Sequence, residues 1–118
     1  MRIFNVDHSD PAARPDIAAR LLPGETVEAA FTAGSSAIFF TDRRIVTVHL
    51  QTLLAERRET TSFSYREMRH FSLLEGAPGE SRTELRIWIG DDPQPLHLRA
   101  GEGADLEPLH LFLAGKLR

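Results

Sequence analysis

Two short apolar runs, residues 37–40 and 45–48, are separated by only four residues, Thr41-Asp-Arg-Arg44. Each run is too short for a helix, and β-branched and aromatic side chains are enriched in both. A polar break of this length between two such runs is typical of a tight turn that joins antiparallel strands. A second segment of the same character lies downstream, at residues 83–90. These runs constrain the chain to a mainly β fold.

Alternating apolar and polar residues extend the pattern to seven strands. Besides 37–40, 44–50 and 83–90, the predicted strands lie at about residues 26–31, 57–65, 69–75 and 96–99. The last two strands are expected to form a hairpin across Asp91-Asp-Pro-Gln94. Leu85 and Ile87 on its first strand can then meet Leu96 and Leu98 on its second, so this hairpin should belong to the core.

The periodicity changes to that of a helix near the carboxyl end. Its apolar positions recur every three or four residues, at Leu106, Leu109, Leu113 and Leu117. Asp105 is suited to the N-cap, and Pro108 falls in the first turn, where proline is tolerated. We predict a helix over residues 104–117 that covers the barrel. Near the amino end, prolines at 11 and 15 predict a short helix that ends near Pro23-Gly24.

A chain of 118 residues is expected to form one domain with a single core. We divide it into an N-terminal extension with the short helix (1–24), a β-barrel (25–100) and the C-terminal helix (104–117). The formal charge of −3, from 14 basic and 17 acidic residues, provides no general attraction to nucleic acid or to an anionic membrane.

Cysteine is absent, which excludes disulfides, thiolate metal sites and cysteine nucleophiles and suits a reducing compartment. The first residues lack the apolar region of a signal peptide, and no apolar run approaches the ~18 residues of a membrane span. The sequence therefore predicts a cytoplasmic protein.

Seven short strands followed by one amphipathic helix is the layout of a pleckstrin-homology-like barrel. Four motifs strengthen the likeness: Leu21-Leu-Pro-Gly-Glu25, Phe40-Thr-Asp-Arg-Arg-Ile45, Tyr65-Arg-Glu-Met-Arg-His-Phe-Ser72 and Thr83-Glu-Leu-Arg-Ile-Trp-Ile-Gly90. On these motifs, residues 21–117 resemble the bacterial pleckstrin-homology family. The resemblance implies a partly open barrel of two antiparallel sheets, with the helix plugging one end. It also implies ring-like homo-oligomers, often pentamers, and no assigned catalytic activity.

The resemblance raises phosphoinositide binding as a hypothesis. In eukaryotic relatives this binding requires cations on the loop between the first two strands, yet Ala33-Gly-Ser-Ser36 has none. A membrane-lipid partner is therefore not expected. Two basic pairs, Arg43-Arg44 and Arg57-Arg58, remain as candidates for a weaker anion or headgroup site. The alternative is that these arginines form solvated salt bridges, with Glu56 and Glu59 as available partners.

Enzyme and metal sites find little support in the sequence. The five histidines lack the close spacing of a helical zinc site, and neither a nucleophile elbow nor a phosphate-binding glycine loop occurs. We predict no catalytic residue, no metal and no cofactor. A small hydrolase that uses Ser35 or Ser36 with a spatially adjacent histidine stays open as an alternative, because triads are defined by geometry.

Trp88 is the most informative single residue for function. Alternation within 83–90 places it outward beside Arg86, and the hairpin register adds His97 and Arg99 to the same face. An aromatic anchor among charged residues is typical of protein interfaces. The alternative is that the N-terminal helix or a loop covers Trp88 within one monomer. We therefore predict a non-catalytic interaction module that forms a homo-oligomer and binds a protein or peptide partner.

Overall fold

The computed structural model describes residues 2–8, 19–33, 36–51, 57–76, 83–100 and 105–117; for residues 2–8, 33, 50 and 51 the description is confined to the backbone. The described part contains strands, one 3-10 helix and one α-helix. In chain order they are β1 (Arg2–His8), β2 (Val27–Ala33), β3 (Ser36–Thr41), β4 (Arg44–Gln51), β5 (Arg57–Ser64), η2 (Tyr65–Glu67), β6 (Met68–Glu75), β7 (Thr83–Ile89), β8 (Leu96–Ala100) and α2 (Glu107–Lys116).

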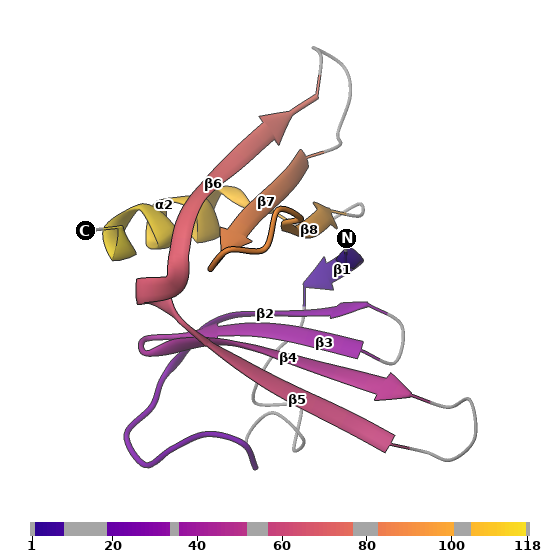
Figure 1. The fold of residues 1–118 in the computed structure, drawn as a ribbon, viewed down its shortest axis with the longest axis vertical. Helices are drawn as coiled ribbons and strands as arrows, with labels where there is room; N and C mark the ends of the chain where they lie inside the picture. Colours follow the sequence, from indigo (N-terminus) through magenta and orange to yellow (C-terminus); the bar gives the residue numbers. More distant parts are fainter. Residues whose placement is uncertain are drawn as a thin grey trace.

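The strands are hydrogen-bonded in the order β5-β4-β3-β2-β1-β8-β7-β6. Strands β2 to β5 form one antiparallel sheet and β6 to β8 form another. β1 joins them, antiparallel to β2 and parallel to β8. The two sheets diverge from η2, with β2 to β5 below and β6 to β8 above in the view of Figure 1, and α2 lies beside the upper sheet. This is the predicted mainly β fold, a partly open barrel with a C-terminal helix.

The seven predicted strands correspond to β2 through β8, and β1 is an additional strand that the sequence analysis left within the N-terminal extension. Its partners are β2 and β8, and β8 lies more than ninety residues further along the chain, so local periodicity carries little information about this pairing. The predicted N-terminal helix falls mostly on residues 9–18, outside the described residues. In the described part of that region, residues 19–20 and 23–24 form turns, and Gly24 has a φ of 79°.

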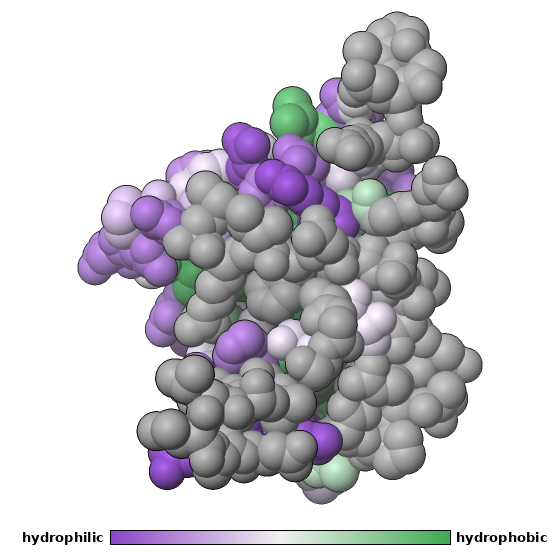
Figure 2. All heavy atoms as spheres, turned by 90° about the vertical axis from the view of Figure 1, so that its right-hand side faces the viewer, coloured by the Kyte–Doolittle hydropathy of each residue, from purple (hydrophilic) through white to green (hydrophobic). Residues whose placement is uncertain are grey.

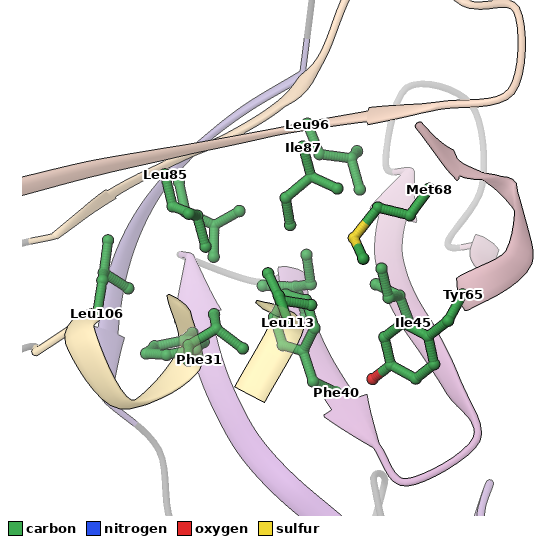
Figure 3. Close-up of a cluster of buried hydrophobic side chains, with 13 residues drawn as sticks. Phe31, Phe40, Ile45, Tyr65, Met68, Leu85, Ile87, Leu96, Leu106 and Leu113 are labelled. Carbon is green, nitrogen blue, oxygen red and sulfur yellow. The ribbon is translucent and has the colours of Figure 1, made fainter. Parts of the chain in front are cut away.

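The main core lies between the two sheets and α2. Figure 3 shows Leu113 of α2 pointing toward Phe31, Phe40 and Ile45 from the lower sheet, with Leu85 above them. The predicted hairpin register is confirmed, because Leu85 lies opposite Leu98 and Ile87 opposite Leu96, and all four side chains are buried. Each fully buried leucine or isoleucine contributes about 1.5–3 kcal/mol relative to an exposed one.

The helix confirms most of the predicted leucine stripe. Leu106, Leu109 and Leu113 are buried, whereas Leu117 is 43% exposed. Leu117 was wrongly included because α2 ends at Lys116 and the next residue adopts an extended backbone conformation that turns it away from the stripe. At the start, the N-cap is Leu106 and not the predicted Asp105, although the Asp105 carboxylate accepts a hydrogen bond from the Glu107 backbone N–H at 3.0 Å.

The lower sheet is apolar on its second face as well. Phe39, Val46 and Val48 join Ala30 in a separate buried cluster, against which Leu21 packs. Two covered faces explain why residues 37–41 are buried without interruption. They also explain why this segment reads as an almost continuous apolar run, as in other strands that are buried on both sides.

Candidate functional site

The outer face of β6 to β8 carries the predicted interface residues. Trp88 lies opposite His70 of β6 and stacks on its imidazole, with ring centroids 4.3 Å apart and an interplanar angle of 18°. Beside this stack, the Glu84 carboxylate contacts Arg99 Nε at 3.1 Å and Arg86 at 3.7 Å. We call these five residues, His70, Glu84, Arg86, Trp88 and Arg99, the outer patch.

The outer patch combines aromatic surface with accessible charge. The side chains of Arg86 and Arg99 are 41% and 48% exposed, and Trp88 is half-buried. On the side of the molecule that Figure 2 shows, purple hydrophilic residues gather above the middle, beside a small green hydrophobic group near the upper edge. His70 is absent from the predicted interface residues, because its contact with Trp88 depends on the β6–β7 register.

His97 was predicted to belong to the accessible face, and for this residue the prediction is wrong. Its side chain lies opposite Arg86 as expected, but the residue is only 3% exposed. β8 is an interior strand between β1 and β7, and His97 Nε2 lies 3.4 Å from Glu84 Oε2. The imidazole of His97 is therefore buried against Glu84 of the outer patch and is not an accessible part of it.

The two arginine pairs do not converge. Arg44 is in register with Ser64 and Arg57 with Gln51, so the pairs occupy opposite ends of the β4–β5 hairpin. Seven residues of strand separate these ends by roughly 23 Å. Arg57 and Arg58 are exposed, and the half-exposed Arg43 side chain lies 3.8 Å from Asp42. A single anion site that uses all four arginines is therefore ruled out in this conformation.

Arg44 has a structural role instead. Its guanidinium donates to both carboxylate oxygens of Glu25 at 2.9 Å, to the Arg20 carbonyl at 2.6 Å and to Ser62 Oγ at 2.8 Å. Glu25, whose side chain is fully buried, also accepts from Thr41 Oγ1 at 2.7 Å and from the Leu22 backbone N–H at 2.9 Å. This network fastens residues 20–25 to β3, β4 and β5.

The same network perturbs two ionisable groups. Hydrogen bonds from Arg44 lower the pKa of Glu25 to about 2, against the opposing effect of burial. Nearby, burial and then the negative charges of Glu28, Asp42 and Glu25 raise the pKa of Tyr65, whose hydroxyl donates to the Thr41 carbonyl at 2.6 Å. Both groups are held by internal partners, which indicates a structural role.

Two residues of the hydrolase alternative, a serine and a histidine, do lie within hydrogen-bonding distance. Ser36 Oγ lies 3.0 Å from His49 Nδ1, and His49 is in register with Glu59 of β5. The three residues form a cross-strand row in which His49 and Glu59 are exposed. A working triad also requires oxyanion donors and a substrate cleft beside the nucleophile. The groove described next is lined by other residues.

A groove of about 740 Å³ opens between β5 and the β7–β8 turn. Its apolar lining includes Phe63 of β5, Ile87 and Ile89 of β7, and Leu96 of β8. Carboxylates lie around it at Glu67, Asp91 and Asp92, all on exposed residues. From the sequence, residues 91–94 are predicted only as a turn, because the groove forms only when β5 faces this turn.

Two backbone N–H groups at the β7–β8 turn bind two of these acidic residues, Glu67 and Asp92. The Gly90 N–H donates to the Glu67 carbonyl at 2.7 Å, and Asp92 accepts from the Gln94 N–H at 2.9 Å. Gly90 has a φ of 61°, a left-handed conformation that favours glycine. One of the carboxylates, Asp91, lies 3.3 Å from the exposed Arg69.

Within the described residues, no three histidine, aspartate or glutamate side chains are grouped so that they could hold a metal ion. In that same part of the chain, no helix has the length and apolar character needed to cross a bilayer.

Comparisons with known proteins agree with this architecture. The family described as "Bacterial PH domain" matches residues 2–117. The uncharacterised protein YjqA of Bacillus subtilis (strain 168) is 34% identical over 87 residues, which cover 74% of this chain and 70% of that protein.

Two solved structures share the fold. A DUF1696 family protein with a pleckstrin-homology domain from Shewanella loihica PV-4 superimposes with a TM-score of 0.77 and 18% identity, over 95% of this chain and 97% of that one. A pleckstrin homology domain from Shewanella amazonensis SB2B gives a TM-score of 0.68 and 19% identity, over 89% and 95%. At these identities the two structures establish the pleckstrin-homology fold and nothing further.

Proposed function

The chain belongs to the bacterial PH domain family, and on that premise we propose that it is a non-catalytic interaction module. In this proposal, copies of the chain assemble into a closed ring, and the ring binds a protein or peptide partner. The ring is what the family resemblance implies, and the outer patch is the observation that supports an interface.

The outer patch has the chemistry of a contact surface between proteins. Trp88 and two arginines are residue types that are enriched at interfaces and at their energetic centres. Stacking on His70 holds the indole in place, which reduces the side-chain entropy lost when a second subunit covers it. A closed ring requires each subunit to present two different surfaces, and the outer patch supplies one of them.

Light scattering coupled to size exclusion tests the assembly. One chain has a mass of 13.2 kDa, so a pentamer would have about five times that mass. We expect the wild type to be ring-sized and Trp88→Ala to dissociate, with the far-ultraviolet circular dichroism unchanged.

Leu111→Ala is the matched control, because Leu111 is 63% exposed on α2 and lies outside the outer patch. This variant should keep the wild-type mass. A wild type that elutes as a monomer would refute the assembly, and equal dissociation of both variants would refute the role of the outer patch.

We do not extend the proposal to anion binding or hydrolysis. Arg44 is bound to Glu25, and the exposed Arg43 lies at the other end of the hairpin from Arg57 and Arg58. Flotation with anionic vesicles at low salt should therefore leave the protein unbound. The Ser36–His49 contact lies outside the groove, and a turnover screen that compares the wild type with Ser36→Ala addresses it.

A further inference from the structure

We propose that the groove between β5 and the β7–β8 turn binds an extended segment of a partner protein in which an apolar side chain is flanked by lysine or arginine residues. This inference rests on the proposed function as an interaction module, and it names the site and the chemistry of the partner. It concerns a surface separate from the outer patch.

The charge around the groove indicates that the partner segment carries lysine or arginine residues. Three carboxylates, Glu67, Asp91 and Asp92, belong to the lining, whereas none of its described residues is a lysine or arginine. Arg69 lies near Asp91 but in an exposed pair, where solvent weakens the interaction. An anionic ligand would be repelled here, and a cationic one attracted.

The apolar lining of the groove indicates that the partner segment also carries an apolar side chain. Phe63 and Ile89 are only partly buried, and they lie beside Ile87 and Leu96, which belong to the main core. An apolar side chain that enters the groove would therefore cover surface that the fold leaves partly open to water. The volume is within the range of sites that enclose whole ligands, so the groove can accept more than one side chain.

The adjacent sheet edge favours an extended peptide over a small molecule. β5 is the last strand in the hydrogen-bonding order, and two of its residues, Thr61 and Phe63, line the groove. Within the described part of the chain, β4 is the one strand next to β5, so the opposite edge of β5 borders no other described strand. A partner segment in extended conformation can pair with this edge while alternate side chains turn into the groove.

Fluorescence anisotropy with labelled nine-residue peptides tests the proposal. One peptide alternates valine and leucine with lysine, and its matched partner carries glutamate in place of every lysine. We expect the lysine peptide to bind and the glutamate peptide not to bind. Replacing both aspartates, Asp91→Asn with Asp92→Asn, should weaken binding of the lysine peptide roughly 4- to 25-fold, since each exposed charge pair is worth about a factor of two to five.

The control variant removes the same charge elsewhere. Glu75→Gln with Glu107→Gln neutralises two exposed carboxylates that do not line the groove. It should bind the lysine peptide as tightly as the wild type. Equal weakening in both double variants, equal binding of both peptides, or no binding of the lysine peptide would overturn the proposal.

Chemical-shift mapping and solution mass complete the experiment. Amide shifts caused by the lysine peptide should cluster along residues 61–64 and 90–96, and a cluster on the outer patch would overturn the assignment of the site. Light scattering on the Asp91→Asn, Asp92→Asn variant should give the wild-type mass. The groove proposal and the assembly proposal can thus fail independently, since Trp88→Ala is expected to retain peptide binding.

Discussion

Replacing Glu25 by glutamine should be among the most damaging conservative changes in this chain. The carboxylate is fully buried and accepts hydrogen bonds from Arg44, Thr41 and the Leu22 backbone. Glutamine has nearly the same shape, but its amide NH₂ would direct donors toward groups that are themselves donors. The Arg44 guanidinium would then lose its counter-charge while its side chain remains only 20% exposed.

The free energy of unfolding that is lost in Glu25→Gln follows from two independent arguments. The pKa of Glu25 falls from 4.5 to about 2 in the folded protein, and at about 1.4 kcal/mol per unit this corresponds to about 3 kcal/mol of folding free energy. Removing one partner of a buried ion pair typically costs about 3–5 kcal/mol. Arg44 keeps its bonds to Ser62 and to the Arg20 carbonyl, so we expect the lower value, about 3 kcal/mol.

The pH dependence gives the sharper test. Because the folded pKa lies below the unfolded one, the contribution of Glu25 is complete above pH 4.5 and is lost as the pH falls toward about 2. Between pH 7 and pH 3 the wild type should lose about 2 kcal/mol through this group alone. The gap between wild type and Glu25→Gln should therefore narrow from about 3 to about 1 kcal/mol over that range.

Urea unfolding at fixed protein concentration measures the loss of stability at pH 7 and its change with pH. The only tryptophan, Trp88, is the fluorescent reporter. Asp91→Asn serves as the control, because this carboxylate is fully exposed in its pair with Arg69 and its loss should leave the unfolding midpoint unchanged. A Glu25→Gln variant as stable as the wild type at pH 7 would refute the reasoning. So would a gap that stays constant as the pH falls.

Two further predictions concern the core. Tyr65 is the only tyrosine, so the change in absorbance at 295 nm on phenol ionisation reports on it alone. Because its pKa is raised in the folded protein, the folded phenol should stay protonated through pH 10. The free energy of unfolding should fall above pH 10, since the phenol of the unfolded chain ionises there. Ionisation near pH 10 with unchanged circular dichroism would contradict this. Leu85→Ala removes a fully buried side chain and should cost about 2–5 kcal/mol in urea unfolding. Leu74→Ala, at a position 51% exposed on the neighbouring strand β6, should cost far less.

The β7–β8 hairpin illustrates what sequence reasoning predicts well. Its alternation is local, and the pairing of Leu85 with Leu98 follows once the turn at 90–95 is recognised. The outward position of Trp88 follows from the same alternation, as does its place beside Arg86. The helix was equally predictable, since its three buried leucines recur with helical spacing.

The arginines and His97 illustrate the opposite case. Residue type and neighbours made Arg44 an anion-binding candidate, but its guanidinium donates to Glu25, nineteen residues earlier, and to Ser62 and the Arg20 carbonyl. His97 lies on the predicted face, yet it is buried, with its Nε2 3.4 Å from Glu84 Oε2. Neither outcome follows from alternation, because each depends on a neighbour that is distant in the chain.

The sequence by itself determined where most strands begin and end, where the C-terminal helix lies and which family the chain resembles. The strands and the helix follow from periodicity and turn chemistry, which act over a few residues, whereas the resemblance rests on the four quoted motifs. Only the tertiary structure decided which polar groups remain accessible, that β1 joins the two sheets, and that β5 and the β7–β8 turn enclose an acidic groove. Burial, pKa and surface shape depend on contacts between residues far apart in the chain, and those contacts exist only after folding.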